Sequence, residues 1–349
     1  MRYPQFLTDG GRLGFIAPSF GCNIEPYKSA FDNAKRKFVD MGYSTIDGPN
    51  AYAGDGIGIS STPQQCADEI NLFFKNDMSD VVFSCGGGEL MCEDLPFVDF
   101  EAIKASKPKW FMGYSDNTNL TFLLNTLCDT ASVYGPCAPT FGMEQWHQAI
   151  EDAFDLIRGN KTEFSSYGKW ERESLKTEEN PLAPYNVTEE SVRRLYIGNK
   201  KVDSLTMSGR LLGGCLDCLN NLVGTKFDKV AKFNEKYGND GILWFLESCD
   251  LNMMDLRRTV WHLENAGWFD KCSGFIIGRP LHYDEEFMGL DRFTAVLEII
   301  KHHNVPIMFD ADLGHLPPAI PIVSGAKASL KAEGNEYRIS YEIKNAPNL

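Results

Sequence analysis

Three residues of types that together can hydrolyse an amide bond, Ser115, Glu247 and His315, each follow a short apolar segment of the chain. Ser115 lies in GYSD, Glu247 ends ILWFLE, and His315 follows MFDADLG. A serine hydroxyl becomes a nucleophile when a histidine takes its proton and a carboxylate orients that histidine. Because ligands of open α/β sheets bind beyond the carboxyl ends of the strands, these three positions are candidates for one catalytic set.

Each of the three residues also has an ordinary structural interpretation. GYSD lacks the second glycine of the G-x-S-x-G nucleophile elbow, because Asn117 stands at that position. The side-chain oxygen of Ser115 or Asp116 would equally serve as the N-cap of a following helix. Taken alone, a loop histidine such as His315 is more often structural than catalytic. Glu247 is the only ionisable residue of its apolar run, so its carboxylate needs a partner such as an imidazole.

The segment SCGGGEL at residues 84–90 offers both an anion cradle and a competing nucleophile. Its glycines can turn backbone N–H groups toward a ligand, although the segment matches neither GxGxxG nor GxxxxGK[ST]. A plain tight turn explains the glycines equally well. Cys85 follows a strand and precedes glycines, as the nucleophile of a cysteine hydrolase or amidotransferase would. Against this alternative, the most elbow-like turn of the chain holds Ser115.

No residue pattern points to a bound metal or to another cofactor. Cys215-x-x-Cys218 has no second pair of cysteines or histidines at zinc spacing, and GGCLDCLNNL is typical of a helix with cysteines on a packed face. The ten cysteines lack the dense spacing of a disulfide scaffold, so we expect most of them to be buried thiols. The remaining histidines lie in helical stretches, a loop or a helix end: His147, His262, His282, His302 and His303.

Composition excludes several classes of partner. A chain of 349 residues is long enough for two domains that each bury a core. No apolar run approaches the roughly 18 residues that a membrane span needs. A formal net charge of −14 argues against binding to a nucleic-acid backbone. The N-terminus lacks the pattern of a secretory signal, which predicts a cytoplasmic protein.

Apolar segments of strand length alternate with amphipathic helical segments from residue 12 onward, and this alternation indicates an α/β fold with a largely parallel sheet. In the first half we expect strands at 12–19, 81–84, 109–114 and 132–137 and helices at 25–42, 62–76 and 117–128. In the second half we expect strands at 241–247, 273–279 and 305–312 and helices at 252–267 and 287–303. Two alternating runs around Gly334-Asn335 predict a terminal hairpin.

The polar, proline-containing stretch at 161–205 lacks sustained periodicity and separates the two halves. We therefore predict an N-terminal nucleophile domain over residues 1–160. The stretch 161–205 is a linker or an excursion that covers a site. A C-terminal domain over 206–349 carries Glu247 and His315.

An ordered set of motifs resembles the LD-carboxypeptidase family of serine peptidases, peptidase family S66. The motifs are SCGGGEL, KWFMGYSDNTNL, MSGRLLGGCLDCLNNLVGT, ILWFLES, GFIIGR and DADLGHLPPAIPIVSGAKASL. The resemblance extends from about residue 12 to residue 340. The chain length, the extended middle segment and a glycine loop followed by Glu-Leu are most similar to the microcin C immunity-protein branch of the family.

The resemblance implies a fold, an activity and roles for single residues. The family joins an N-terminal flavodoxin-like α/β domain to a smaller C-terminal β-rich α/β domain, with the active site between them, and commonly forms homodimers. Its members hydrolyse amide bonds without a metal, through a Ser-Glu-His triad. Carried over by motif, Ser115 is the nucleophile, Glu247 orients the base and His315 is the base. The oxyanion donors would be the backbone N–H groups of Gly87 and Asp116.

The resemblance leaves two substrate classes open, a murein peptide cleaved at an L,D linkage and a peptidyl-nucleotide of the microcin C type. Many LD-carboxypeptidases carry an arginine where this chain has Cys85, so the side chain expected to bind a peptidoglycan carboxylate is missing. Gly86 and Gly88 are expected to border the substrate. Trp170 of the middle segment is expected either to stack on a nucleobase or cover the site, or to pack on its own domain. A non-catalytic binding protein on the same fold is a further alternative.

Overall fold

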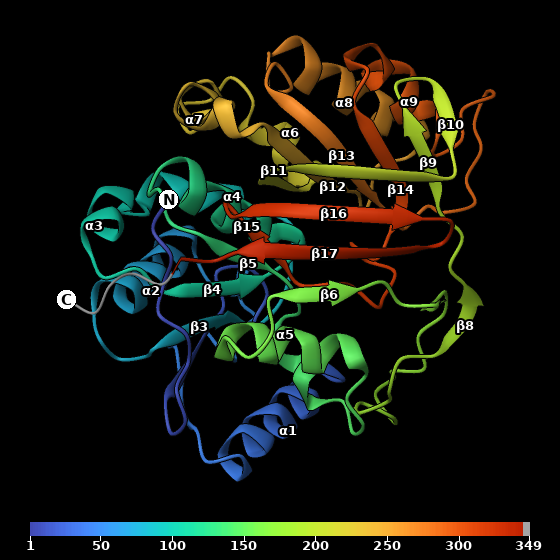
Figure 1. Ribbon diagram of the computed structural model, residues 1–349. Coiled ribbons are helices and arrows are strands. Elements are labelled where there is room, and N and C mark those ends of the chain that lie inside the picture. The colour runs from blue at the N-terminus through green and yellow to red at the C-terminus, as the bar shows by residue number, and fades with distance from the viewer. Residues whose placement is uncertain (345–349) are drawn as a thin grey trace.

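The computed structural model describes residues 1–344, in which two large β-sheets are flanked by helices (Figure 1). The first sheet has six strands in the order β15-β5-β4-β3-β1-β2. Its first five strands in the sequence run parallel, and β15 pairs antiparallel with β5. The strands are β1 (Arg12–Ile16), β2 (Ser44–Asp47), β3 (Val81–Ser84), β4 (Trp110–Gly113), β5 (Ser132–Tyr134) and β15 (Ile322–Ser324). The helices of this half are α1 (Tyr27–Asp40), α2 (Pro63–Lys75), α3 (Phe100–Ala105), α4 (Thr118–Thr126) and α5 (Gln148–Arg158).

The second sheet has nine strands in the order β10-β9-β14-β13-β12-β11-β16-β17-β6. Its central strands are parallel and are β11 (Ser204–Cys215), β12 (Ile242–Glu247), β13 (Cys272–Gly278) and β14 (Pro306–Ala311). The expected terminal hairpin is confirmed as β16 (Lys327–Glu333) and β17 (Glu336–Glu342). The helices α6 (Leu216–Leu222), α8 (Met253–Asn265) and α9 (Thr294–Ile300) gather on one side of this sheet, and α7 (Val230–Tyr237) lies near them (Figure 1). The predicted α/β class with two sheets is therefore confirmed.

The middle segment, residues 161–205, contributes short strands to both edges of the second sheet. Its strands there are β6 (Glu163–Ser165), β9 (Arg194–Ile197) and β10 (Lys200–Val202). Two more strands, β7 (Lys169–Glu171) and β8 (Val187–Glu190), form a separate antiparallel pair. Strands of three or four residues bury at most two side chains on one face, which explains why the sequence shows no sustained alternation. The division of the chain at residues 160 and 205 stays a prediction.

Two expected elements differ from the structure. The helix expected at 287–303 begins only at Thr294, because residues 287–290 form a turn in which Met288 and Gly289 have positive φ. Asp291 then accepts the Thr294 N–H at 2.7 Å, as a helix-capping residue does. The residues 213–215, expected to belong to a helix, instead end strand β11. The helix α6 starts one residue later and carries Cys218 on its buried face.

The two sheets share their hydrophobic core. One cluster of buried side chains includes Phe15 and Phe83 of the first sheet together with Leu211, Phe245 and Ile339 of the second. Such a core fixes the two sheets against each other through close-packed side chains. Within residues 1–344, no helix combines the length and the apolar character needed to cross a membrane.

The first turn of α4 and the end of β11 are in direct contact. The Cys215 N–H donates to the Thr118 hydroxyl at 3.0 Å. Gly214 has a φ of 144°, and a Cβ there would lie 2.5 Å from the Thr118 side chain. Only glycine therefore allows the second sheet to approach the helix that begins just after Ser115. This contact sets the distance between the carboxyl ends of β4 and β12.

A buried carboxylate between two arginines holds the segment that follows β14. Asp312 is fully buried and accepts hydrogen bonds from Arg193 at 2.5 Å and from Arg279 at 2.8 Å. It also accepts the Tyr167 N–H at 2.9 Å, while its own N–H donates to the Tyr337 hydroxyl at 3.1 Å. Both guanidinium groups contact this one carboxylate, and these contacts offset part of the cost of burying the three charges.

The change Asp312→Ala is expected to lower the free energy of unfolding by about 3–5 kcal/mol, because it leaves two buried guanidinium groups without their carboxylate. Urea denaturation followed by circular dichroism measures this loss. The matched control is Asp9→Ala, whose partner Arg158 lies 3.3 Å away on the surface and whose own side chain is 92% exposed. The control should cost less than about 1 kcal/mol, and equal losses in the two variants would contradict the argument.

Candidate active site

Ser115 lies on a sharp turn between β4 and α4, as the first residue of a 3-10 turn, η3 (Ser115–Asn117). Its φ is 63°, in the left-handed region that residues other than glycine rarely adopt. Such backbone strain is retained only where the surrounding contacts enforce it, and it is concentrated at functional sites. Gly113 is required on the strand side, because a Cβ there would lie 2.9 Å from the Asn117 side chain. The turn therefore has the strand–turn–helix context of a nucleophile elbow without its second glycine.

The structure brings Ser115, His315 and Glu247 together in one hydrogen-bonded chain. His315 Nε2 lies 2.9 Å from Ser115 Oγ, and His315 Nδ1 lies 2.8 Å from Glu247 Oε2. With the imidazole proton on Nδ1, that nitrogen donates to the carboxylate and Nε2 accepts the serine O–H. Ser115 follows β4, His315 follows β14, and Glu247 is the last residue of β12. The three side chains therefore meet at strand ends, as expected, and they come from both sheets.

The carboxylate of Glu247 and the imidazolium of His315 each stabilise the charge of the other. Burial alone would raise the pKa of Glu247, but His315 and the hydrogen bonds from His315 and Tyr134 hold this pKa below its usual value. Burial likewise opposes the charge on His315, yet the carboxylate of Glu247 raises the pKa of His315 well above its usual value, with a smaller contribution from Cys249. Glu247 therefore stabilises the imidazolium, which is the form that a general base reaches after it takes a proton.

Tyr134, which the sequence analysis missed, links Glu247 to the turn that carries Ser115. The phenol lies at the end of β5, is 2% exposed, and donates to Glu247 Oε1 at 2.5 Å. The same hydroxyl accepts the Ser115 N–H at 3.1 Å. The N–H of Ser115 is thereby occupied, which leaves the groups at Asp116 and Gly87 as the candidates for an oxyanion hole. Its place at the end of a parallel strand was the signal that could have identified Tyr134.

The glycine loop after β3 lies over Ser115. A Cβ at Gly87 would lie 3.1 Å from both Cβ and Oγ of Ser115, so a side chain there would press against the serine. The Asn117 side chain donates to the Gly86 carbonyl at 2.7 Å and to the Tyr114 carbonyl at 3.0 Å. Asn117, which replaces the second glycine of the elbow, therefore ties the turn to the loop.

Asp116 holds the other side of the turn through its buried carboxylate. It accepts hydrogen bonds from the Ser19 hydroxyl at 2.6 Å, the Met91 N–H at 2.9 Å and the Asn119 amide at 3.0 Å. Burial raises the pKa of Asp116, although these hydrogen bonds act in the opposite direction. The side chain thus joins the turn to the segments at residues 19 and 91, while its backbone N–H remains a predicted oxyanion donor.

Arg279 holds the loop that carries His315. Its guanidinium donates to the carbonyls of Leu316 at 3.1 Å and Pro318 at 3.0 Å, in addition to Asp312. On the other side of the histidine, a Cβ at Gly314 would lie 2.8 Å from Glu247 Oε2. Contacts of the residues before and after His315 in the sequence therefore hold the imidazole in place.

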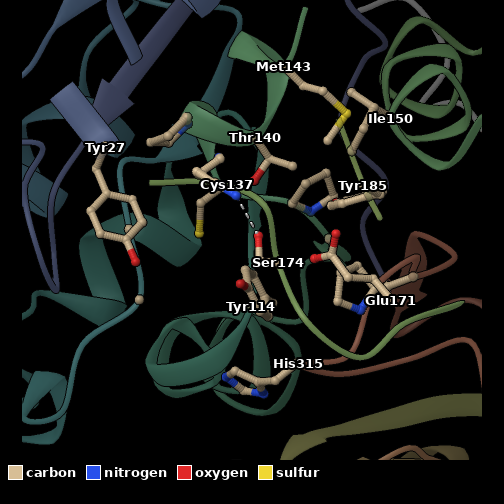
Figure 2. A pocket seen from close by; sticks show the side chains of 18 of the residues that line it. Tyr27, Tyr114, Cys137, Thr140, Met143, Ile150, Glu171, Ser174, Tyr185 and His315 are labelled. Carbon is tan, nitrogen blue, oxygen red and sulfur yellow. Dashed lines mark hydrogen bonds between the residues drawn. The ribbon is translucent and has the colours of Figure 1, made fainter. Parts of the chain in front are cut away.

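A cavity of about 350 Å³ opens beside this site and is lined by both halves of the chain. Figure 2 shows His315 and Tyr114 next to one another, with Tyr27, Tyr185 and Glu171 at the sides of the open space. The residues that line the cavity include Gly86, Gly87, Tyr134, Glu171, Lys176 and His315. Gly86 and Gly87 thus border the cavity, whereas Gly88 packs toward Ser19 and is not among its lining residues.

Cys85 lies beside the cavity but is poorly suited to be a nucleophile. The residue is 1% exposed, and burial raises the pKa of its thiol well above the usual value. A thiolate is the reactive form, so a raised pKa suppresses reactivity. The nearby groups that raise this pKa further are Cys22, Glu69 and Asp47, and none of them is a base of the histidine type.

Trp170 does not line the cavity in the described residues. It is 2% exposed, and its ring centroid lies 4.8 Å from that of Tyr283. The guanidinium groups of Arg172 and Arg279 lie 5.1 Å and 5.5 Å from its ring. Trp170 therefore packs on Arg172 of its own segment and on Arg279 and Tyr283 of the second half of the chain, and a contact between Trp170 and a substrate stays a prediction.

Among residues 1–344, one group of three side chains could hold a metal ion, and none of the three lines the cavity. Glu264, His302 and His303 each offer a ligand atom, and these atoms lie within 4.8 Å of one another. His302 and His303 contact the two carboxylate oxygens of Glu264 at 3.0 Å and 2.8 Å. In contrast, Cys215 ends β11 and Cys218 lies on α6. Within the described residues, neither cysteine belongs to a group of potential metal ligands.

The change Glu247→Gln is expected to lower the pKa of His315 to its usual value of roughly 6.5 or below, because burial then acts without the opposing carboxylate. The pKa of His315 in the native protein lies above that value, so the imidazolium persists to a higher pH before the change than after it. Titration of the ring resonances by NMR measures the shift. The other five histidines are internal controls, and an unchanged His315 titration would contradict the assigned contact.

The change Tyr134→Phe is expected to move the pKa of His315 in the opposite direction, upward, because Glu247 loses a donor that shares its negative charge. The variant should also lose about 1.5–3 kcal/mol of unfolding free energy, the contribution of a hydrogen bond to a charged group. NMR titration and urea denaturation measure the two effects. Tyr341→Phe is the control, since Tyr341 is buried and donates to the Pro321 carbonyl at 2.8 Å. A pKa shift of equal size in the control would rule out a specific role for Tyr134.

Comparison with known proteins extends over nearly the whole chain. The family model described as the LD-carboxypeptidase N-terminal domain matches residues 13–135, and that of the LD-carboxypeptidase C-terminal domain matches residues 208–330. A Vibrio cholerae protein with a provisional carboxypeptidase name is 22% identical over 97% of this chain and 98% of its own length. The microcin C7 self-immunity protein MccF of Escherichia coli is 24% identical over 96% of this chain and 94% of its own length.

Solved structures show the same fold. The structure of MccF in complex with aspartyl sulfamoyl adenosine has a TM-score of 0.82 at 22% identity and covers 98% of this chain and 99% of its own. An MccF-like protein from Bacillus anthracis has a TM-score of 0.79 at 19% identity and covers 98% of this chain and all of its own. Because the two family models together match more than half of the chain, in the expected order, the chain belongs to the LD-carboxypeptidase family, peptidase family S66.

Proposed function

We propose that this protein is a serine peptidase that hydrolyses an amide bond with Ser115 as nucleophile, His315 as base and Glu247 as the acid that orients the base. The observation that carries the proposal is the hydrogen-bonded chain of 2.9 Å and 2.8 Å between these side chains, beside a cavity of about 350 Å³. Membership of the LD-carboxypeptidase family supports the same reaction class. The mechanism requires no metal and no other cofactor.

In the proposed reaction, His315 Nε2 takes the Ser115 proton while Oγ attacks the scissile carbonyl carbon. The imidazolium that forms is stabilised by Glu247, whose carboxylate keeps its charge through the contacts from Tyr134 and His315 itself. His315 then gives the proton to the leaving amine. Water, activated by the same histidine, hydrolyses the acyl-enzyme and restores the serine.

The oxyanion of the tetrahedral intermediate would be held by the N–H groups of Gly87 and Asp116. The close approach of Gly87 to Ser115 supports the first donor, since a Cβ at this position would lie 3.1 Å from Ser115 Oγ. The position of Asp116 at the start of the 3-10 turn supports the second. Each such donor contributes about 3 kcal/mol to lowering the barrier of acyl transfer.

Two substrate classes follow from the relatives. A murein peptide fits the carboxypeptidase relationship. A peptidyl-nucleotide conjugate fits the relationship to MccF, whose solved complexes include aspartyl sulfamoyl adenosine and glutamyl sulfamoyl guanosine. The Cys85 alternative has no support from the burial or the pKa of that thiol. The homodimer and the cytoplasmic location stay predictions.

The proposal is tested by measuring D-alanine release from a murein tetrapeptide and amino acid release from an aminoacyl-sulfamoyl adenosine. We expect the wild-type protein to cleave at least one of them, and Ser115→Ala to lose at least about 10³-fold in kcat/KM, because the nucleophile is removed. Cys85→Ala is the matched control and should retain most of the activity. Activity that survives in Ser115→Ala but not in Cys85→Ala would replace the serine mechanism by the cysteine one.

A further inference from the structure

One wall of the cavity comes from the last residue of β7 and the segment between β7 and β8. Six residues of this segment line the cavity: Glu171, Ser174, Lys176, Ala183, Pro184 and Tyr185. Figure 2 shows Glu171, Ser174 and Tyr185 facing the same open space as Tyr114 and His315. The middle segment therefore forms part of the space that a substrate bound at Ser115 would occupy.

Lys176 is the only lysine or arginine among the lining residues that the structure describes. Its side chain is half-buried, and burial lowers the pKa of its ammonium group while Glu171 acts to raise it. Within residues 1–344 no carboxylate oxygen comes within 4.0 Å of Lys176 Nζ, so the ammonium group has no ion-pair partner there. A cation that has lost part of its hydration without gaining a partner is an unsatisfied site for an anion.

Glu171 does not neutralise this lysine. Its carboxylate is 5% exposed and accepts a short hydrogen bond from the Asn186 N–H, which holds it toward the β8 side of the segment. Burial raises the pKa of Glu171, while the Asn186 N–H and Lys176 act to lower it. One ammonium without an ion-pair partner beside one carboxylate held by a backbone N–H suits a ligand group with a single negative charge. A dianionic phosphate would be repelled by Glu171 and would meet only one cation.

The cavity also limits the size of the ligand. Its volume of about 350 Å³ lies at the small end of ligand pockets, which suits a short peptide segment. His315, Gly87 and Lys176 all line this cavity. A peptide that fills it therefore contacts both His315 and Lys176. Position 85 cannot supply this contact, because its side chain is a buried cysteine.

We propose that Lys176 is the residue that binds the C-terminal carboxylate of the substrate, and that it selects peptides with a free carboxyl terminus. The inference rests on the proposed function for the cleavage step but concerns recognition alone. The chemistry is an ion pair between an ammonium and a carboxylate, with the aromatic rings of Tyr27, Tyr114 and Tyr185 lining the same cavity. The middle segment thereby determines specificity, while the two sheets supply the reacting groups.

The test uses a murein tetrapeptide and the same peptide with a C-terminal carboxamide. Binding is measured by calorimetry in the Ser115→Ala background, where no cleavage interferes. We expect Lys176→Met to weaken binding of the acid by about tenfold or more, the effect of about 1.4 kcal/mol, and to leave the amide unchanged. Lys176→Arg should restore binding of the acid. The control Lys169→Met removes an exposed lysine of β7, paired with Glu190 at 3.3 Å, and should have no effect.

Kinetics with the intact serine separate recognition from cleavage. For the acid peptide, Lys176→Met should raise KM by about tenfold and leave kcat nearly unchanged, because a uniform binding contact is lost. Equal weakening of acid and amide in calorimetry, or no binding of the acid, would overturn the assignment of Lys176. Carboxylate-dependent binding together with a complete absence of turnover in the wild-type protein would overturn the proposed function and leave the carboxylate site in place.

Discussion

The contact between the buried carboxylate of Glu247 and its two donors is the interaction on which the site depends. A carboxylate at the end of the buried strand β12 stays ionised only if hydrogen bonds and a nearby cation replace the water that it has lost. His315 and Tyr134 supply these bonds at 2.8 Å and 2.5 Å. Each donor comes from a different strand end, so the charge exists only when both sheets are assembled. The same charge then keeps the pKa of His315 high.

The rest of the local structure keeps these groups at hydrogen-bonding distance. The contact of Thr118 with the end of β11 joins the helix after the serine to the sheet that carries the acid. Arg279 holds the histidine loop, and it is itself held by the buried carboxylate of Asp312. Removal of one member of such a buried network exposes unpaired charge, which explains why positions far from the serine should affect both stability and geometry.

The proposed reacting groups and the proposed specificity surface come from different kinds of structure. Ser115, Glu247 and His315 lie at the ends of buried strands, and the shared hydrophobic core sets their positions. The cavity wall with Lys176 belongs to a segment whose strands have three or four residues and whose side chains are largely exposed. Such segments tolerate change more easily than a core does.

The sequence by itself determined the α/β class, most of the helices and strands, and the residue types needed for amide hydrolysis, because hydrophobic periodicity and strand-end positions are local properties. It did not reveal Tyr134, Asn117 or Lys176, since an ordinary tyrosine, asparagine or lysine has no distinguishing neighbours along the chain. It also placed residues 213–215 in a helix, whereas their close approach to Thr118 requires an extended strand. Only the tertiary structure decided that positions 115, 247 and 315 lie within hydrogen-bonding distance, because that proximity arises from the packing of one sheet against another.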